Sequence, residues 1–282
     1  MPSAASREYP SPLWPRGRVG GPGLAGKRVA GYITRSRTRA ARLRPNPPDA
    51  EGSTAMTERF FSDAELREME RRTVDRLVDA IDAGDSERAR KLARRMYNEF
   101  LSMHDLYRNW VTATLSEVGR RYGDEALDEV MVEGVRAWWK PILDGMPQDP
   151  AMLPAKIKMF ASGLHGHLQP LEIEEDAEKV TIKMCPCGSG GRLVQEGKYE
   201  GENAFLKVEK PQRLTYGCKD YPVYCGHEYA MERIDIEENG HPFVVVEPAA
   251  EIGKEHCSLV VYKDPKAIPL KYYERIGLKK PA

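Results

Sequence analysis

Apolar residues recur at helical spacing from about residue 57 to residue 165, and the pattern then changes to the alternation that is typical of β-strands. Ser62 and Glu65 form the signature of a helix start, in which a hydroxyl and a carboxylate each accept a backbone amide of the other residue. Gly84 and the pair Gly123-Asp124 mark the ends of further helical segments. Residues 57–165 are therefore predicted to be helical.

After His167 the sequence predicts strands. Residues 171–174 and 180–183 alternate apolar and polar side chains around a polar turn at 175–177, which predicts a β-hairpin. Further strands are predicted at residues 206–208, 213–216, 230–236, 243–246 and 259–262. Strands and helices do not alternate along the chain, which disfavours a parallel sheet. The expected fold class is α+β, with a helical N-terminal block packed on a C-terminal antiparallel sheet that carries a metal-binding Cys/His site.

Composition divides the chain into three regions. Residues 1–55 are rich in Pro, Gly, Ser and Arg, hold ten basic and three acidic residues, and lack apolar periodicity. Such a segment buries too little apolar surface to offset its ordering entropy, so we expect a disordered basic extension. It is interpreted as preceding the true start at Met56, with a targeting presequence or a functional basic tail as alternatives. A helical region, 56–167, and an antiparallel β metal-binding region, 168–282, follow.

Charge and hydropathy exclude several classes of partner. Outside residues 1–55 the chain holds 33 basic and 40 acidic residues, so its body is mildly acidic. Nucleic-acid binding needs a concentrated basic face, and no such partner is expected. No stretch approaches eighteen apolar residues, and no secretory signal is evident. The sequence therefore predicts a cytoplasmic protein without a membrane partner.

Cysteines supply the most specific chemical signal. The chain has five, all within its last hundred residues: Cys185, Cys187, Cys218, Cys225 and Cys257. An odd number without a secretory signal favours metal binding over a disulfide framework. Cys185 with Cys187, and Cys225 with His227, place two soft ligands one residue apart at glycine-containing turns. Because zinc prefers four thiolate or imidazole ligands, these four residues are predicted to bind zinc.

Other interpretations of the cysteines stay open. Cys218 can replace His227 as a ligand, which would free the imidazole for acid–base work. An iron–sulfur cluster on Cys185, Cys187, Cys218 and Cys225 is an alternative, as are thiols that bind no metal. A site closed by four protein ligands would be structural, whereas three ligands and a water would be catalytic.

The segment Cys185-Pro186-Cys187-Gly188-Ser189-Gly190 resembles the opening of the SEC-C zinc motif. That resemblance implies ligand roles for Cys185 and Cys187. The motif closes with a second ligand pair about eight to ten residues later, and residues 193–202 contain neither Cys nor His. Cys225 and His227 are the expected replacement.

The order of a helical half followed by a sheet with scattered cysteines resembles L-2-amino-thiazoline-4-carboxylic acid hydrolase-like and four-vinyl-reductase-type proteins. Residues 122–127 and Cys257 carry this resemblance. It implies a small-molecule hydrolase in which a metal-bound water or Cys257 attacks an electrophilic carbon, with His227 as a second catalytic candidate. The alternatives are a non-catalytic, zinc-stabilised module that binds a protein partner, and an iron–sulfur redox protein.

Three further histidines have simpler interpretations. His165 and His167 are expected at a polar helix end, although an extended backbone would place both rings on one face. His104 lies on a helical stripe with Tyr107 and Trp110, where core packing is favoured over a ligand role.

Overall fold

The computed structural model describes residues 59–184 and 186–281, so the predictions for 1–55, Met56 and Cys185 concern positions outside the described residues. The described residues fall into two compact units, one ending at Met96 and the other beginning at Tyr97. Each unit is described by itself. Among the helices of the described ranges, none is both long and apolar enough to cross a membrane.

The first unit, 59–96, is helical. It contains α1 (Asp63–Glu70), α2 (Thr73–Asp82) and the beginning of α3 (Ser86–Gly145). The capping box is confirmed, since the Ser62 amide donates to Glu65 Oε2 over 2.8 Å and the Glu65 amide donates to Ser62 Oγ over 3.3 Å. Gly84, between α2 and α3, has a φ of 71°, a conformation that glycine adopts without strain.

A kink at Gly123 divides α3. Gly123 has a φ of 82° and a ψ of −178°, so residues 86–122 and 124–145 form two helical limbs. A side chain at this positive φ would be strained, which explains why glycine stands there. The sequence predicted a helix boundary at Gly123, and the structure confirms it, since one helical limb ends and the next begins at this kink. Further along the chain, α4 (Leu153–Leu164) ends in a 3₁₀ turn (His165–His167).

The C-terminal part of the second unit is built on an antiparallel sheet with the strand order β1-β2-β6-β5. Its strands are β1 (Leu171–Glu175), β2 (Lys179–Met184), β5 (Val245–Glu247) and β6 (Cys257–Tyr262). The predicted hairpin is confirmed, with Ile173 opposite Ile182. Two short strands, β3 (Lys207–Val208) and β4 (Tyr221–Pro222), form a separate pair.

Two predicted strands are wrong. Residues 230–236 belong to helix α6 (Gly226–Asn239), and Arg213–Thr215 form a 3₁₀ turn. Ile234 and Ile236 flank Asp235, which imitates β alternation, but Asp235 is buried like its neighbours. A prediction based on hydropathy assigns a carboxylate to the surface, so a carboxylate in the core leads it to the wrong secondary structure.

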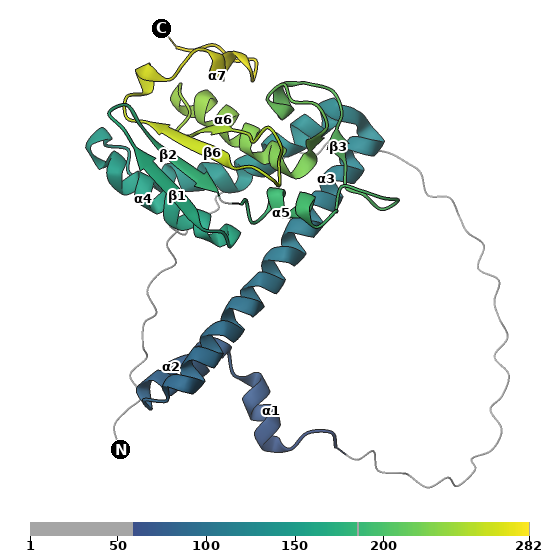
Figure 1. The fold of residues 1–282 in the computed structure, drawn as a ribbon, viewed down its shortest axis with the longest axis vertical. Helices are drawn as coiled ribbons and strands as arrows, with labels where there is room; N and C mark the ends of the chain where they lie inside the picture. The colour runs from purple at the N-terminus through teal and green to yellow at the C-terminus, as the bar shows by residue number, and fades with distance from the viewer. Residues whose placement is uncertain (1–58, 185, 282) are drawn as a thin grey trace, which may run out of the picture. The chain divides into compact units, whose positions relative to one another are not determined.

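Helices and sheet enclose one core in the second unit, as expected from the α+β class (Figure 1). Side chains of α3, α4 and α6 pack on the strands, and Trp139, Phe160 and Phe243 form consecutive edge-to-face contacts with ring centroids 6.4 and 5.4 Å apart. Two short helices, α5 (Gly190–Gln195) and α7 (Lys271–Glu274), complete the unit.

Candidate functional site

A cavity of about 130 Å³ lies within the second unit, between α3, α4, α6 and the sheet. Most of its wall is apolar. Trp138 and Trp139 come from α3, Phe160 and Leu164 from α4, and Leu259 from β6. The cavity therefore lies where the helical layer meets the sheet.

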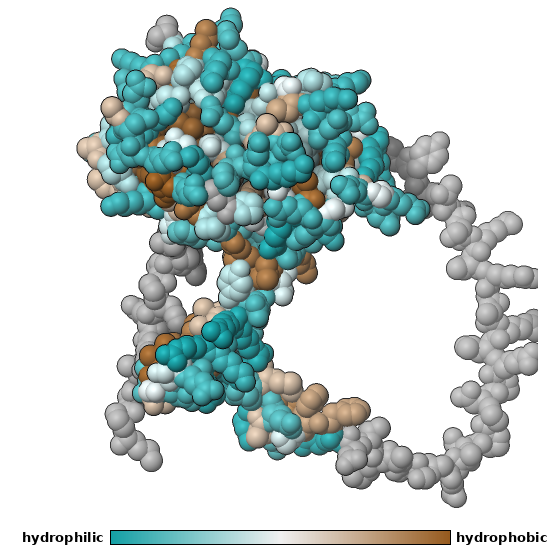
Figure 2. Space-filling view, in the orientation of Figure 1, coloured by the Kyte–Doolittle hydropathy of each residue, from teal (hydrophilic) through white to brown (hydrophobic). Residues whose placement is uncertain are grey.

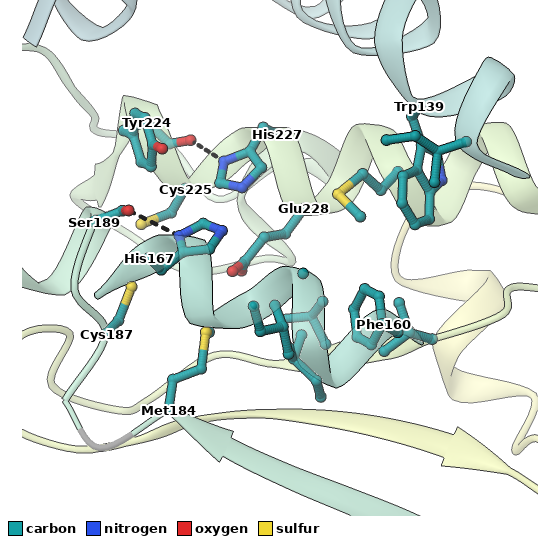
Figure 3. Close-up of a pocket in the computed structure, with 18 of the residues that line it drawn as sticks. Trp139, Phe160, His167, Met184, Cys187, Ser189, Tyr224, Cys225, His227 and Glu228 are labelled. Atoms are coloured by element: carbon teal, nitrogen blue, oxygen red, sulfur yellow. Dashed lines mark hydrogen bonds between the residues drawn. The ribbon is translucent and has the colours of Figure 1, made fainter. Parts of the chain in front are cut away.

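Polar side chains gather at one end of this cavity. Figure 3 shows His167, Cys187, Cys225, His227 and Glu228 around it, together with Ser189 and Tyr224. Three of the four predicted metal ligands, Cys187, Cys225 and His227, thus line one space, whereas Cys185 lies outside the described residues. Cys225 and His227 stand at the beginning of α6 and not in a hairpin.

The remaining cysteines lie elsewhere. Cys257 does not line the cavity; it begins β6 opposite Met184, and its Sγ accepts the Ala249 amide over 3.5 Å. Burial raises the pKa of Cys257 to about 12, which disfavours the thiolate that a nucleophile requires. Cys218 lines a separate depression beside Tyr221.

Within the described residues, no group of three or more His, Cys, Asp or Glu side chains is arranged to hold a metal ion. Burial raises the pKa of both Cys187 and Cys225, which favours the protonated thiols. His227 Nδ1–H donates to the backbone carbonyl of Tyr224 over 2.6 Å. Only its Nε2 is left to act as a ligand.

The glycines after Cys187 have a packing role. A Cβ on Gly188 would lie 1.7 Å from the carbonyl oxygen of His167, and one on Gly190 would lie 2.5 Å from Cys225 Sγ. Any side chain at either position would clash with these atoms. The glycine-rich loop that suggested a metal turn is thus explained by the close approach of three segments.

Ser189 joins two histidines. Its Oγ lies 2.8 Å from His167 Nδ1 and 2.9 Å from His104 Nε2, and His104 Nδ1 lies 3.1 Å from Asp105 Oδ1. Burial, with contributions from His227 and His104, lowers the pKa of His167 to about 4. His167 is therefore neutral at pH 7. The sequence singled out both histidines but had no signal that one serine would connect them.

Sequence reasoning missed Glu228 as a cavity residue. Burial raises its pKa to about 8, and its Oε2 is buried without a hydrogen-bond partner among the described residues. Glu232 and Asp235 follow at i+4 and i+7 on α6, and both are buried. The signal that could have identified Glu228 was the spacing of acidic residues at i, i+4 and i+7, which is typical of one face of a helix. It was overlooked because residues 230–236 were predicted to form a strand.

A second surface lies on α3. Large apolar side chains between residues 97 and 111 are about half exposed, and Trp110 is 64% exposed: Tyr97, Phe100, Met103, Leu106, Tyr107, Trp110 and Val111. Figure 2 shows hydrophobic residues on the exposed part of this helix. We call these seven residues the α3 apolar face. The opposite side of the helix is held by buried Arg108, which donates to Glu196 Oε2 over 2.7 Å.

The α3 apolar face meets a groove of about 400 Å³ at Val111. Leu115, Val130 and Met131 line the groove, which extends to His167 and His227. Both imidazoles also line the 130 Å³ cavity, so the groove and the cavity share part of their walls.

Residues 73–134 match the family model of a B12 binding domain. The match covers α2 and α3 as far as Gly134, which is less than half of the chain. It includes the α3 apolar face and the residues that α3 contributes to the groove between Val111 and Gly134. No curated protein and no solved structure matches this chain.

These findings overturn the functional predictions made from the cysteines. The matched family is a B12 binding domain, so the identification with the SEC-C motif or with thiazoline hydrolase-like and four-vinyl-reductase-type proteins is wrong. The predicted cofactors, zinc and an iron–sulfur cluster, are wrong. The functions that depended on them, a zinc-binding hydrolase, a zinc-stabilised module and an iron–sulfur redox protein, are therefore wrong as well. The physical reason is that Cys187, Cys225 and His227 are not arranged as a ligand set in the described residues.

Proposed function

We propose that this chain binds a cobalamin through the helical segment 73–134. The observation that carries the proposal is the match of this segment to the model of a B12 binding domain. The sequence predicted a small-molecule ligand, and we propose that this ligand is a corrinoid.

The residues present fit one face of such a molecule. A corrin is a broad, flattened macrocycle, and the α3 apolar face offers a broad exposed surface with four aromatic rings. Those of Tyr107 and Trp110 are stacked with centroids 6.3 Å apart. Exposed apolar surface of this extent marks an interaction site in water-soluble proteins. A corrinoid is too large for the groove to enclose, so this exposed face is the proposed contact.

His227 is the described residue best prepared to supply a nitrogen ligand to cobalt. It lines the groove, its Nδ1–H is taken by the Tyr224 carbonyl, and its Nε2 keeps a lone pair. Histidines that bind metals commonly donate their second ring N–H to a carbonyl in this way. His167 reaches the same groove, but its Nδ1 is bound to Ser189.

Bound cobalamin would supply a cobalt centre for alkyl-transfer or radical chemistry. The chain itself would contribute the apolar contact and a neutral imidazole. Burial lowers the pKa of His227, which favours the neutral form that a metal requires.

The test is a titration of the full chain with hydroxocobalamin, followed by visible absorption and by equilibrium ultrafiltration. We expect one cobalamin per chain. Trp110→Ala should weaken binding about tenfold, because an aromatic side chain at the centre of a contact commonly contributes 1–2 kcal/mol or more.

Tyr122→Ala is the matched control. Tyr122 is an exposed aromatic residue of the same matched segment, 71% exposed, but it lies about 18 Å further along α3 from Trp110. Its loss should leave the affinity unchanged. Absence of any bound cobalamin would overturn the proposed function, and equal effects of the two substitutions would remove the α3 apolar face from it.

A further inference from the structure

The 130 Å³ cavity is a second space, and none of the seven residues of the α3 apolar face lines it. An engineered apolar protein cavity of about 150 Å³ binds benzene, so this one has room for a single ring-sized molecule. Its volume excludes a corrinoid. A ligand of the cavity must therefore be a different compound from the one proposed for α3.

The wall of the cavity selects the body of that ligand. Trp139, Phe160 and Met184 form part of a surface that is predominantly apolar, and Val246 and Leu259 continue it on the sheet. Among the described lining residues there is no lysine or arginine, so an anion would find no fixed positive charge. The wall favours an uncharged or cationic molecule with an apolar ring.

The polar requirement of the cavity follows from three acids at i, i+4 and i+7 on α6, namely Glu228, Glu232 and Asp235. Two have full sets of donors. Glu232 accepts from Arg275 Nη2 over 2.7 and 3.0 Å and from the Val246 amide over 2.5 Å. Asp235 accepts from Trp139 Nε1 over 2.7 Å and from the Phe243 amide over 2.9 Å. Both carboxyl groups thus have hydrogen-bond donors, as buried polar groups commonly do.

Glu228 is the exception among the three. Its Oε2 is buried and accepts no hydrogen bond from the described residues, and Figure 3 shows its carboxyl group directed into the cavity on the side of His167 and His227. His227 Nε2 is a second acceptor at the same end, because the ring proton lies on Nδ1. The polar end of the cavity therefore offers two acceptors, and one of them, Glu228 Oε2, has no donor among the described residues.

We propose that this cavity binds a compact molecule with an apolar, ring-sized body and one hydrogen-bond donor that is directed at Glu228. The donor would be a hydroxyl, an amine or an N–H group, each of which completes the hydrogen bonding of Oε2. The two spaces share His167 and His227, but Glu228 lines the cavity and not the groove, so this site can be tested without a corrinoid.

The test compares benzyl alcohol with toluene, which has the same ring and no donor, by NMR titration of the full chain. Glu228→Met removes the acceptor at similar size, and Glu237→Met makes the same change on α6 outside the cavity. The preference for benzyl alcohol over toluene, as a ratio of Kd values, should fall at least about tenfold in Glu228→Met. In Glu237→Met the ratio should equal that of the wild type, and benzoate should bind none of the three proteins.

Two results would overturn the proposal: an unchanged ratio in Glu228→Met, or binding of neither compound to the wild type. If Glu228→Met does not fold, intermolecular NOEs in the complex of the wild-type protein with benzyl alcohol test the position of the ligand instead. Contacts from the benzyl alcohol methylene to Glu228 support the site. Contacts from that methylene to Trp139 and Phe160, with none to Glu228, contradict it.

Discussion

His227 Nδ1–H donates a 2.6 Å hydrogen bond to the backbone carbonyl oxygen of Tyr224. Because a carbonyl oxygen can only accept, this bond determines the tautomer and leaves the lone pair on Nε2. Both residues line the groove next to the α3 apolar face and also the 130 Å³ cavity. This one contact therefore prepares His227 for a role in either space.

Replacing His227 should change the spectrum of bound cobalamin. We expect His227→Ala to remove the spectral shift that accompanies replacement of cobalt-bound water by an imidazole nitrogen, and to weaken binding at least about tenfold. His241→Ala, which changes a histidine that does not line the groove, should bind with the wild-type spectrum. A wild-type spectrum in His227→Ala would exclude this residue as the ligand.

The stability of the fold should fall as pH rises from about 6.5 to 8. Burial raises the pKa of Glu228 from its ordinary value of 4.5 to about 8, so the folded state holds a proton that the unfolded state has lost. Folding stability then decreases with pH over this interval, by at most about 1.4 kcal/mol per pH unit for one group. Below pH 6.5 the lowered pKa values of His167 and His227 act in the opposite direction, because the unfolded state then binds more protons at these rings.

Glu228→Gln should make that dependence shallower, since the amide does not titrate. Urea unfolding of both proteins at pH 6.5, 7.25 and 8 measures the difference. Glu117→Gln, at an exposed carboxylate paired with Arg121 over 2.8 Å, serves as the control and should keep the wild-type slope. Equal slopes for the wild type and Glu228→Gln would show that this carboxyl group ionises normally in the folded protein.

Arg275→Met should destabilise the protein by about 3–5 kcal/mol, because it leaves the fully buried Glu232 without its cation. The double variant Arg275→Met/Glu232→Gln should recover part of this loss, since the remaining polar group is uncharged. Lys140→Met, which removes a cation paired with Asp144 at the surface, should cost about 0–1 kcal/mol. Denaturant midpoints give all three values. No recovery in the double variant would mean that Arg275 acts by its packing on Tyr216 and Tyr272.

Gly190→Ala should destabilise the protein by about 1–3 kcal/mol, because the new Cβ would lie 2.5 Å from Cys225 Sγ. Removing that sulfur in Gly190→Ala/Cys225→Ala should restore part of the stability. Gly134→Ala is the matched control: its Cβ would meet nothing within 4 Å, and alanine should stabilise α3 by about 0.5–1 kcal/mol. Thermal melts of the four proteins test this. A loss in Gly190→Ala that Cys225→Ala does not reduce would assign the glycine to backbone conformation.

The helix boundaries and the hairpin could be predicted because their signals are local. Ser62 and Glu65 are three residues apart, Gly123 needs only its own φ, and the alternation in β1 and β2 has a period of two. Helix α6 could not be predicted in this way, because Asp235 occupies a core position. Its carboxylate accepts hydrogen bonds from Trp139 and from the Phe243 amide, which belong to other segments of the chain. A carboxylate in the core looks polar in sequence and becomes compatible with burial only when those partners arrive.

The candidate site divides in the same way. Cys187, Cys225 and His227, which the sequence grouped as metal ligands, line one cavity, but residue types carry no information about burial or protonation. The sequence by itself determined the helical block, the hairpin, the kink at Gly123 and the residues that could approach one another. Only the tertiary structure decided that Cys225 and Cys257 are buried, that Glu228 Oε2 has no donor among the described residues, and that one side of α3 stays exposed. These properties depend on which surfaces are removed from water, and that follows from contacts between segments far apart in the chain.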